Sequence, residues 1–221
     1  MIASEIHSDT IPALSINDSA KRALYLMGFF KVTSIPIVND GEYIGMLNEE
    51  QILDIEKEAF KISECNITKE NNFVDAQQHI YNIISKVDQY KLSLVAVVDD
   101  NNIFLGTITP LELISATAKI TSIDPTGGII VLKMGIRDYT LGEIAQICEN
   151  NQIKILSSYV QSCKDQVNIK LIIKLNTNDL VALKLDLERY NYKIESIILE
   201  NRVIDELEQN RLDEFLHYLN M

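Results

Sequence analysis

The residues best spaced for chemistry in this sequence are Thr109 and Glu112. The run Thr109-Pro110-Leu111-Glu112 places a hydroxyl and a carboxylate three residues apart, and Asn48 with Gln51 repeats that spacing with amides. A pair of this kind satisfies the first backbone amides of a helix as a capping box, with proline at the first helical position. The same groups can instead hold a polar ligand, and the residues leave both interpretations open.

Recognisable catalytic machinery is absent from the sequence. It contains no glycine-rich phosphate loop, no G-x-S-x-G elbow, no cluster of metal ligands and no cysteine–histidine pair in a known context. Cys65, Cys148 and Cys163 stand at unrelated spacings, and we interpret them as reduced, buried thiols. These features predict a protein that is not an enzyme and that has neither a metal site nor a catalytic cofactor.

Charge and hydropathy exclude two further kinds of partner. The 221 residues carry a net charge of −12, with lysine and arginine scattered singly, so binding to a nucleic acid is not expected. The longest apolar runs are far shorter than the ~20 residues of a membrane span. The first ten residues lack the pattern of a signal peptide. We therefore expect a cytoplasmic protein without membrane contact.

The first half of the chain contains one pattern twice: a polar cap, an amphipathic helix, a β-rich strand, an acidic turn, an apolar strand with a glycine, and a second helix. In the first copy these parts are Asn17–Ser19, the face Ala20, Ala23, Leu24 and Met27, Ser34–Val38, Asn39–Glu42 and Tyr43–Leu47. In the second copy they are Asn71–Asn72, the face Ala76, Ile80, Ile83 and Ile84, Leu94–Val98, Asp99–Asn102 and Phe104–Ile108. Two βαββα units that pack against each other are expected.

The duplicated order resembles a pair of CBS domains. Its best signals are Ile35-Pro36-Ile37-Val38, the following Ile44-Gly45-Met46-Leu47, and the parallel Gly106-Thr107-Ile108-Thr109. The resemblance covers residues 1–120, with repeat one at about 1–60 and repeat two at about 61–120. It implies a regulatory module that forms homodimers and binds an adenosine compound (AMP, ATP or S-adenosylmethionine) in a cleft.

The resemblance also implies site residues in the second copy. The family's ribose-binding signature is a glycine, two apolar residues, Ser or Thr, two more residues, and Asp. This chain offers Gly106, Thr109 and Glu112, with Glu in place of Asp. The strand proline of the family is present as Pro36 and is replaced by Ala96 in the second copy.

The first copy departs further from the same signature. It offers Gly45, Asn48 and Gln51, so both polar positions have changed. Asn48 and Gln51 are therefore candidates for a second site, while helix capping alone also explains them.

A second domain is expected after Thr121–Gly128, a stretch rich in turn formers that we interpret as a linker over residues 121–128. The strands and helices that follow are Ile129–Met134, a helix opened by the capping-box pattern Thr140–Glu143, Ile153–Val160, Val167–Leu175, a helix with Leu180, Leu183 and Leu187, and Lys193–Leu199. This βαββαβ order is that of a ferredoxin-like fold, so the predicted fold class is α+β.

Placed after a CBS pair, residues 129–200 resemble an ACT domain, and the whole chain is similar to the AcuB-like accessory proteins of acetoin utilisation. The ACT resemblance implies a ligand contact in the loop Gly135–Thr140, with Asp138 as the candidate residue. In residues 201–221, Leu212, Phe215, Leu216 and Leu219 share a helical spacing. They predict a C-terminal amphipathic helix that packs on the domain's own sheet or on another subunit.

These observations lead to one functional hypothesis and two alternatives. The hypothesis is a non-enzymatic regulatory protein that senses an adenosine-type ligand through its CBS pair. The alternatives are a homodimeric interaction scaffold with degenerate ligand sites, and an amino-acid sensor that works through the ACT-like domain. The sequence does not identify the protein target.

Overall fold

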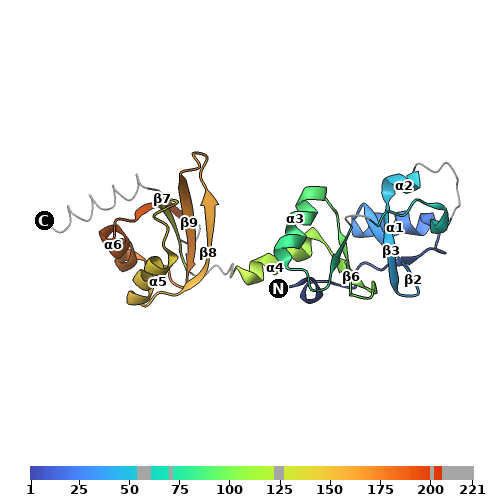
Figure 1. The fold of residues 1–221 in the computed structure, drawn as a ribbon, viewed down its shortest axis with the longest axis horizontal. Helices are drawn as coiled ribbons and strands as arrows, with labels where there is room; N and C mark the ends of the chain where they lie inside the picture. Colours follow the sequence, from blue (N-terminus) through green and yellow to red (C-terminus); the bar gives the residue numbers. More distant parts are fainter. Residues whose placement is uncertain (54–60, 70–71, 122–126, 200–201, 206–221) are drawn as a thin grey trace. The chain divides into compact units, whose positions relative to one another are not determined.

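The chain folds into two compact units, residues 1–120 and 121–221 (Figure 1). The computed structural model describes residues 1–53, 61–69, 72–121, 127–199 and 202–205. The first unit contains two three-stranded sheets with helices, and the second contains one five-stranded sheet with helices. This is the mixed α+β class that the sequence predicts.

Each repeat of the first unit is a βαββα unit, which confirms the predicted fold. The first consists of β1 (Leu14–Ser15), α1 (Ala20–Phe30), β2 (Ser34–Asn39), β3 (Glu42–Asn48) and α2 (Glu49–Leu53). The second consists of β4 (Phe73–Asp75), α3 (Ile80–Tyr90), β5 (Val95–Val98), β6 (Phe104–Ile108) and α4 (Pro110–Ile120). In both sheets the first strand is parallel to the second, and the second is antiparallel to the third.

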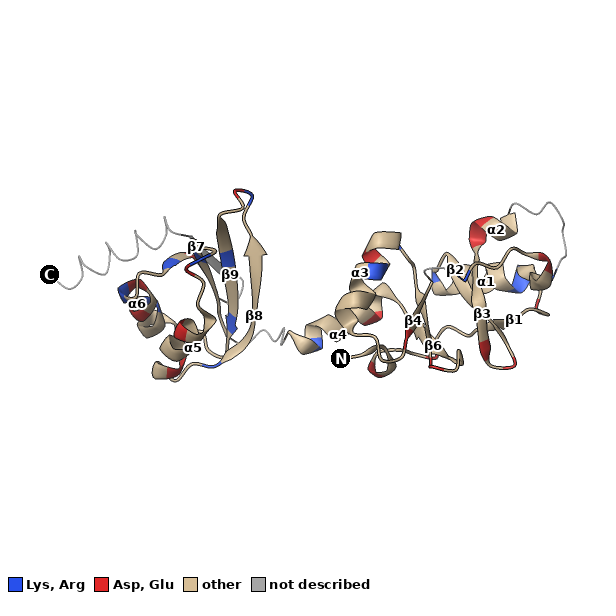
Figure 2. Ribbon diagram, viewed as in Figure 1, with Lys and Arg blue, Asp and Glu red and all other residues tan. Residues whose placement is uncertain are grey.

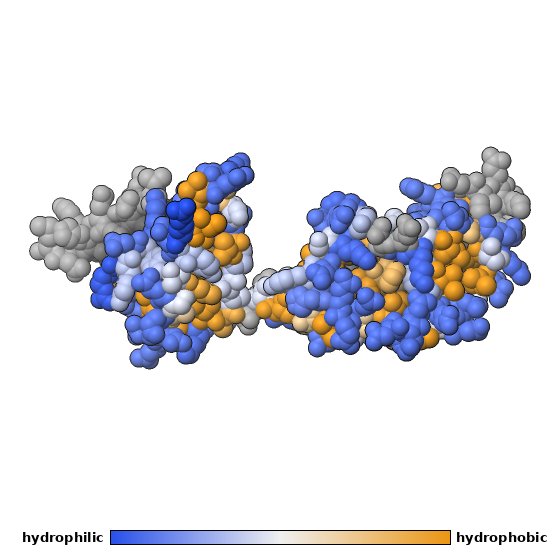
Figure 3. All heavy atoms as spheres, viewed as in Figure 1, coloured by the Kyte–Doolittle hydropathy of each residue, from blue (hydrophilic) through white to orange (hydrophobic). Residues whose placement is uncertain are grey.

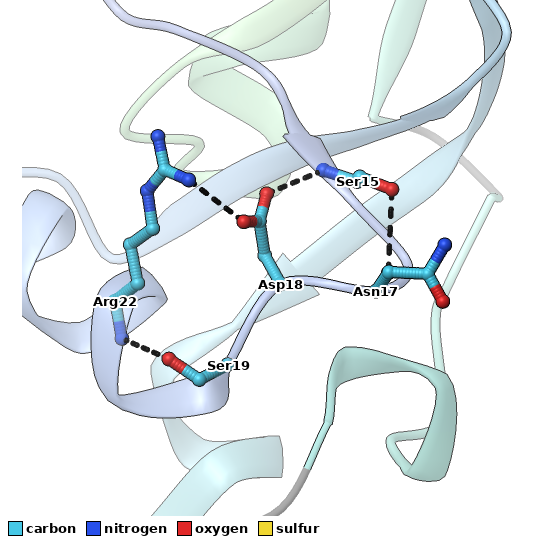
Figure 4. A network of polar contacts seen from close by, with 5 residues as sticks. All are labelled: Ser15, Asn17, Asp18, Ser19 and Arg22. Atoms are coloured by element: carbon cyan, nitrogen blue, oxygen red, sulfur yellow. Dashed lines mark hydrogen bonds and ion pairs between the residues drawn. The ribbon is translucent and has the colours of Figure 1, made fainter.

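A small polar network fixes the start of α1 beside β1 (Figure 4). The Ser19 hydroxyl accepts a hydrogen bond from the Arg22 backbone amide at 3.3 Å, as expected of a helix N-cap. Asp18 accepts from the Ser15 amide at 2.9 Å and pairs with the Arg22 guanidinium at 2.7 Å. Ala20, Ala23 and Met27 are then buried along one face of α1, as the helical spacing predicts.

The start of the equivalent helix in the second repeat differs from the prediction. The helix α3 begins at Ile80, and His79 is its N-cap. Ala76 therefore lies before the helix and not on its face, and the polar cap expected at Asn72 lies before a strand (Asn71 is outside the described residues). The reason is β4, whose residues Phe73–Asp75 pair in parallel with β5 and keep the chain extended there.

The leading segments of the two repeats cross over to each other. Residue Ser8 of the first repeat exchanges two backbone hydrogen bonds with Thr107 of the second, at 2.9 and 3.0 Å. Residue Thr68 of the second repeat makes the same exchange with Met46 of the first, at 3.0 and 2.8 Å. We call residues 1–10 and 61–69 the lead segments. Each repeat is completed by backbone from the other, so the two fold as one unit.

The second unit has the ferredoxin-like βαββαβ order that the sequence predicts. Its elements are β7 (Ile129–Gly135), α5 (Leu141–Asn150), β8 (Ile155–Ser162), β9 (Asn168–Leu175), α6 (Val181–Arg189), β10 (Lys193–Leu199) and β11 (Arg202–Asp205). The strands are antiparallel to their neighbours in the order β11-β10-β7-β9-β8. Both helices pack on one face of this sheet, over a core that includes Ile130, Leu132, Ile147 and Leu183.

The predicted capping box at Thr140–Glu143 does not form. Thr140 is the N-cap residue of α5, but its side chain makes no capping hydrogen bond. The Glu143 carboxylate instead accepts a hydrogen bond of 2.5 Å from the Tyr192 hydroxyl. Tyr192, which is distant in the sequence, therefore binds the carboxylate that the local pattern predicts to cap the helix.

The predicted C-terminal helix does not begin at residue 201. Arg202–Asp205 form β11, which pairs antiparallel with β10 and adds a fifth strand to the sheet. This strand was not predicted. The apolar spacing that predicts the helix begins only at Leu212, so residues 202–205 were included in the helix without a signal of their own. The rest of the predicted helix, residues 206–221, lies outside the described residues.

Candidate ligand site

Two clefts in the first unit are related by the repeat, and each is lined by residues from both copies. The larger, which we call the Thr109 cleft, has a volume of about 540 Å³. Its lining consists of Thr10, Ile11, Phe30, Lys31, Val32, Ser93, Thr109, Pro110, Leu111 and Glu112. The smaller Asn48 cleft, of about 290 Å³, is lined by Thr33, Ser34, Asn48, Glu49, Glu50, Asn72, Tyr90, Lys91, Leu92 and Ser93.

The N-terminus of α4 forms the polar wall of the Thr109 cleft. Glu112 Oε2 accepts hydrogen bonds from the Thr109 backbone amide at 2.6 Å and from the Thr109 hydroxyl at 3.0 Å. The capping box that the sequence predicts here is therefore present. A carboxylate has about four acceptor positions, so these two bonds leave capacity for a further hydroxyl donor. Capping and ligand binding are thus compatible at Glu112.

Apolar residues and one lysine also line this cleft. Phe30, Lys31 and Val32 leave the end of α1, where Lys31 has left-handed backbone dihedrals (φ 58°). The backbone reverses at that point, since its amide bonds back to the Met27 carbonyl. The cleft therefore combines an apolar surface with a cation and with a polar helix start, an arrangement suited to a polar ligand with a flat apolar group.

The Asn48 cleft has the same plan but less favourable chemistry for an anion. The Asn48 amide donates to Gln51 Oε1 at 2.9 Å, and Gln51 Nε2 donates to the Thr68 hydroxyl at 2.8 Å. Gln51 thereby links α2 to a lead segment and does not line the cleft. Glu49 and Glu50 bring two carboxylates to its rim, at the acidic start of α2 in Figure 2.

The lysine of the Asn48 cleft already has an acidic neighbour. Lys91 has the same left-handed conformation after α3 (φ 51°) that Lys31 has after α1. Its ammonium lies 2.6 Å from the Asp88 carboxylate, and this hydrogen bond lowers the pKa of Asp88. Both side chains are 79 % exposed, so the pair is screened by water and contributes little to stability.

The structure brings together only part of the predicted site. Thr109 and Glu112 line the larger cleft, and Asn48 lines the smaller. Gly106 and Pro36 line neither: Pro36 is buried in β2, and Gly106 lies under the first lead segment. Asp138 is exposed in the turn between β7 and α5 of the second unit.

Several cleft residues were not predicted, although the repeat carried a signal for them. Phe30-Lys31-Val32-Thr33 and Tyr90-Lys91-Leu92-Ser93 align as aromatic, lysine, apolar and hydroxyl. Both runs line clefts, and Ser93 lines the two clefts at once. The Ser93 hydroxyl accepts a hydrogen bond from the Thr33 amide at 3.1 Å, which joins the repeats between the clefts.

Two features that would suggest other functions are missing from the part of the chain that the structure describes. No group of three or more His, Cys, Asp or Glu side chains is placed to hold a metal ion there. Within the same residues, every helix is too short or too polar to cross a membrane. Cys148 is buried, and this burial raises the pKa of its thiol to about 11, so the thiol is protonated and unreactive at neutral pH.

Comparison with solved structures gives partial matches at low identity. A CBS domain pair/ACT domain protein from Thermotoga maritima is 14 % identical over 56 % of this chain and 100 % of its own, with a TM-score of 0.49. The structure of CBSX2 in complex with AMP is 18 % identical over 54 % and 97 %, with a TM-score of 0.47. A CBS domain pair in complex with 5′-methylthioadenosine and S-adenosyl-L-methionine is 20 % identical over 54 % and 97 %, with a TM-score of 0.43.

Comparison with family models gives a match in the first repeat. The matched residues, 3–58, include β1, α1, β2, β3 and α2 together with residues 3–10 of the first lead segment. The second repeat has the same strand order and the same reciprocal lead segment. Residues 3–58 therefore match the family model of the CBS domain, and the second repeat has the same strand order as this matched segment.

Proposed function

We propose that this chain is a non-enzymatic regulatory protein whose first unit binds an adenosine-type ligand in the Thr109 cleft. Its second unit would serve as an ACT-like regulatory partner domain. The observation that carries the proposal is the composition of the cleft. A single cavity of about 540 Å³ combines a helix start, a carboxylate with spare acceptor capacity, a lysine and apolar side chains, drawn from both repeats.

Each part of an adenosine nucleotide has a matching group in this cleft. The ribose hydroxyls can donate to the Glu112 carboxylate, which already accepts from Thr109. A phosphate can pair with the Lys31 ammonium. Adenine, which is flat and largely apolar, can pack against Ile11, Phe30 and Val32.

Regulation requires that the ligand bind two conformations with different affinity. The cleft is suited to this because it joins Thr10, at the end of the first lead segment, to the helix α4 of the other repeat. A ligand that contacts both walls favours the arrangement in which they lie close together. We propose that this change in the first unit is the signal that reaches a partner protein.

The test is thermal unfolding of the full chain with AMP, ADP, ATP and S-adenosylmethionine, and with a set of amino acids. A ligand at ~100 times its dissociation constant stabilises the folded state by about 2.7 kcal/mol. Two of these compounds, AMP and S-adenosylmethionine, are named in the compared complexes. We expect stabilisation by an adenosine compound. A shift with an amino acid alone would contradict the proposal and would move the sensor to the second unit.

Matched variants locate the site. Thr109→Ala with Glu112→Ala, and Asn48→Ala with Gln51→Ala, each remove the polar start of a helix, at a cost of about 1 kcal/mol. Only the first pair should lose the ligand-induced shift. If the first pair keeps the shift and the second loses it, the ligand binds in the Asn48 cleft and the assignment of the site is wrong.

A homodimeric interaction scaffold is the second candidate, and two observations favour it. The polar groups of Glu112 and Gln51 already have partners within the protein. Large apolar side chains are exposed on helices of the first unit, among them Phe29 at 66 % and Leu111 at 71 %, and Figure 3 shows apolar atoms at the surface of both units. A dimer in sedimentation equilibrium together with no ligand-induced shift would support the scaffold. A monomer at micromolar concentration would count against it.

A further inference from the structure

The Glu112 carboxylate occupies the position at the start of α4 where an anion would otherwise bind. Backbone amides at a helix start attract negatively charged groups, phosphate among them. Here Glu112 Oε2 lies 2.6 Å from the Thr109 amide nitrogen and 3.0 Å from the Thr109 hydroxyl oxygen. The Thr109 hydroxyl accepts in turn from the Glu112 amide at 3.4 Å, and Pro110 has no amide hydrogen. A phosphate at this helix start would lose these donors and would meet a negative charge.

The charged side chains that line the Thr109 cleft balance each other. Among the lining residues that the structure describes, Lys31 carries the single positive charge and Glu112 the single negative charge. Lys31 is exposed and Glu112 is partly buried, so water screens the lysine more than it screens the carboxylate. The lysine can pair with one phosphate. Each further phosphate adds negative charge, and the described lining offers no second cation to neutralise it.

The same carboxylate still accepts a hydroxyl donor. Its two hydrogen bonds from Thr109 leave acceptor positions unused, so a ribose hydroxyl can bond to it. A hydroxyl brings a hydrogen to this oxygen, whereas a phosphate brings only further acceptors and negative charge. Glu112 therefore distinguishes the sugar of a nucleotide from its phosphate chain, by attraction to the first and repulsion of the second.

We infer that the Thr109 cleft selects adenosine compounds with at most one phosphate, and that Glu112 is the residue that excludes longer phosphate chains. The inference rests on the proposed function, because it requires an adenosine compound to bind in this cleft. It narrows the ligand class to adenosine, its monophosphate, and adenosine compounds whose 5′ substituent contains no phosphate, such as S-adenosylmethionine. ADP and ATP lie outside this class.

The test is isothermal titration calorimetry of the full chain with adenosine, AMP, S-adenosylmethionine, ADP and ATP. The buffer contains EDTA, so that no divalent cation can bridge the phosphates to Glu112. We expect adenosine, AMP and S-adenosylmethionine to bind, and ADP and ATP to bind about tenfold more weakly or not at all, because their added charges are repelled by the carboxylate.

A Glu112→Gln variant tests the role assigned to this residue. Glutamine keeps an acceptor oxygen for the Thr109 amide, as in other capping boxes, but removes the negative charge. We expect the ratio of the dissociation constants of ATP and adenosine to fall by about tenfold. A weaker bond to the ribose would affect both ligands equally and would cancel in this ratio. The matched control is Glu49→Gln, which makes the same change of charge in the Asn48 cleft and should leave the ratio unchanged.

The outcomes separate this inference from the proposed function. If ATP binds the unsubstituted protein as tightly as adenosine and AMP do, the inference is wrong and the proposed function stands. If the ratio changes in Glu49→Gln and not in Glu112→Gln, the inference is also wrong, because the ligand then binds in the Asn48 cleft. If no adenosine compound binds at all, the proposed function and the inference fail together.

Discussion

At the scale of single residues, Gly106 shows how closely the first lead segment is fitted to the second repeat. A Cβ atom added at this position would lie 2.7 Å from the His7 ring and 2.9 Å from the Ser8 carbonyl oxygen. The backbone φ of +150° is also unfavourable for other residues. We therefore predict that Gly106→Ala lowers the free energy of unfolding by about 1–3 kcal/mol, measured by urea denaturation.

The matched control for this prediction is Gly142→Ala. Gly142 lies in α5, and an added Cβ there would meet no atom within 4 Å. Because alanine is the better helix former, this substitution should stabilise the protein by about 0.5–1 kcal/mol. If Gly106→Ala were as harmless as Gly142→Ala, the lead segment would not be held against β6 in solution.

At the scale of elements, the hydrogen bond between Tyr192 and Glu143 joins the start of β10 to α5. Burial and the bond to the Glu143 carboxylate together raise the pKa of Tyr192 to about 12, from an ordinary value of 10.0. The protonated phenol is the form that donates this bond. Its contribution is complete below pH 10 and is lost as the pH rises through the folded-state pKa.

We predict that Tyr192→Phe destabilises the protein by about 1.5 kcal/mol at neutral pH, and that the deficit shrinks as the pH rises above 10. Urea denaturation of both proteins between pH 7 and pH 11 measures the difference. Tyr190→Phe is the control, because it removes the same hydroxyl from a neighbouring tyrosine that is 46 % exposed. A deficit that does not change with pH would show that the bond is not the source of the effect.

The two predicted capping boxes explain which elements a sequence pattern can predict. Thr109 with Glu112 and Thr140 with Glu143 have the same spacing, but only the first pair forms. The difference is Tyr192, which lies 49 residues from Glu143 in the sequence and donates a hydrogen bond to its carboxylate. Helical faces and apolar strands were predicted because their signals are local. The lead segments and β4 were not, because they are extended by pairing with strands distant in the sequence. β11 was not predicted either, although it pairs with the adjacent strand β10.

The same distinction applies to the candidate site. Thr109 and Glu112 were predicted because three residues separate them within one helix start. Lys31 and Phe30 were not, since only the packing of one repeat on the other brings them to the α4 end of the cleft. Gly106 was predicted as a ligand residue, yet its conformation is explained by the lead segment that passes over it. Lys31 and Lys91, which follow α1 and α3 at equivalent positions, were the local signal for the lining residues that were not predicted.

At the scale of the whole molecule, the described hydrophobic cores of the two units share no residue. The first unit has two clusters, one around Ile35, Met46 and Leu94 and one around Ile83 and Val97. Each cluster includes a side chain from the lead segment of the other repeat, namely Ile62 in the first cluster and Ala3 in the second. The second unit has its own cluster under α5 and α6. Residues that pack in connected cores unfold together, so each unit should unfold as one cooperative system.

This separation predicts two transitions when the full chain is studied by differential scanning calorimetry. Gly106→Ala should lower only the first unit's transition, and Tyr192→Phe should lower only the other, which assigns each transition to a unit. An adenosine compound that binds in the Thr109 cleft should then raise only the transition that Gly106→Ala lowers, because a ligand stabilises the cooperative unit to which it binds. A single transition, or a ligand that raises both equally, would show that the two units unfold together and that the separate cores do not define the cooperative systems.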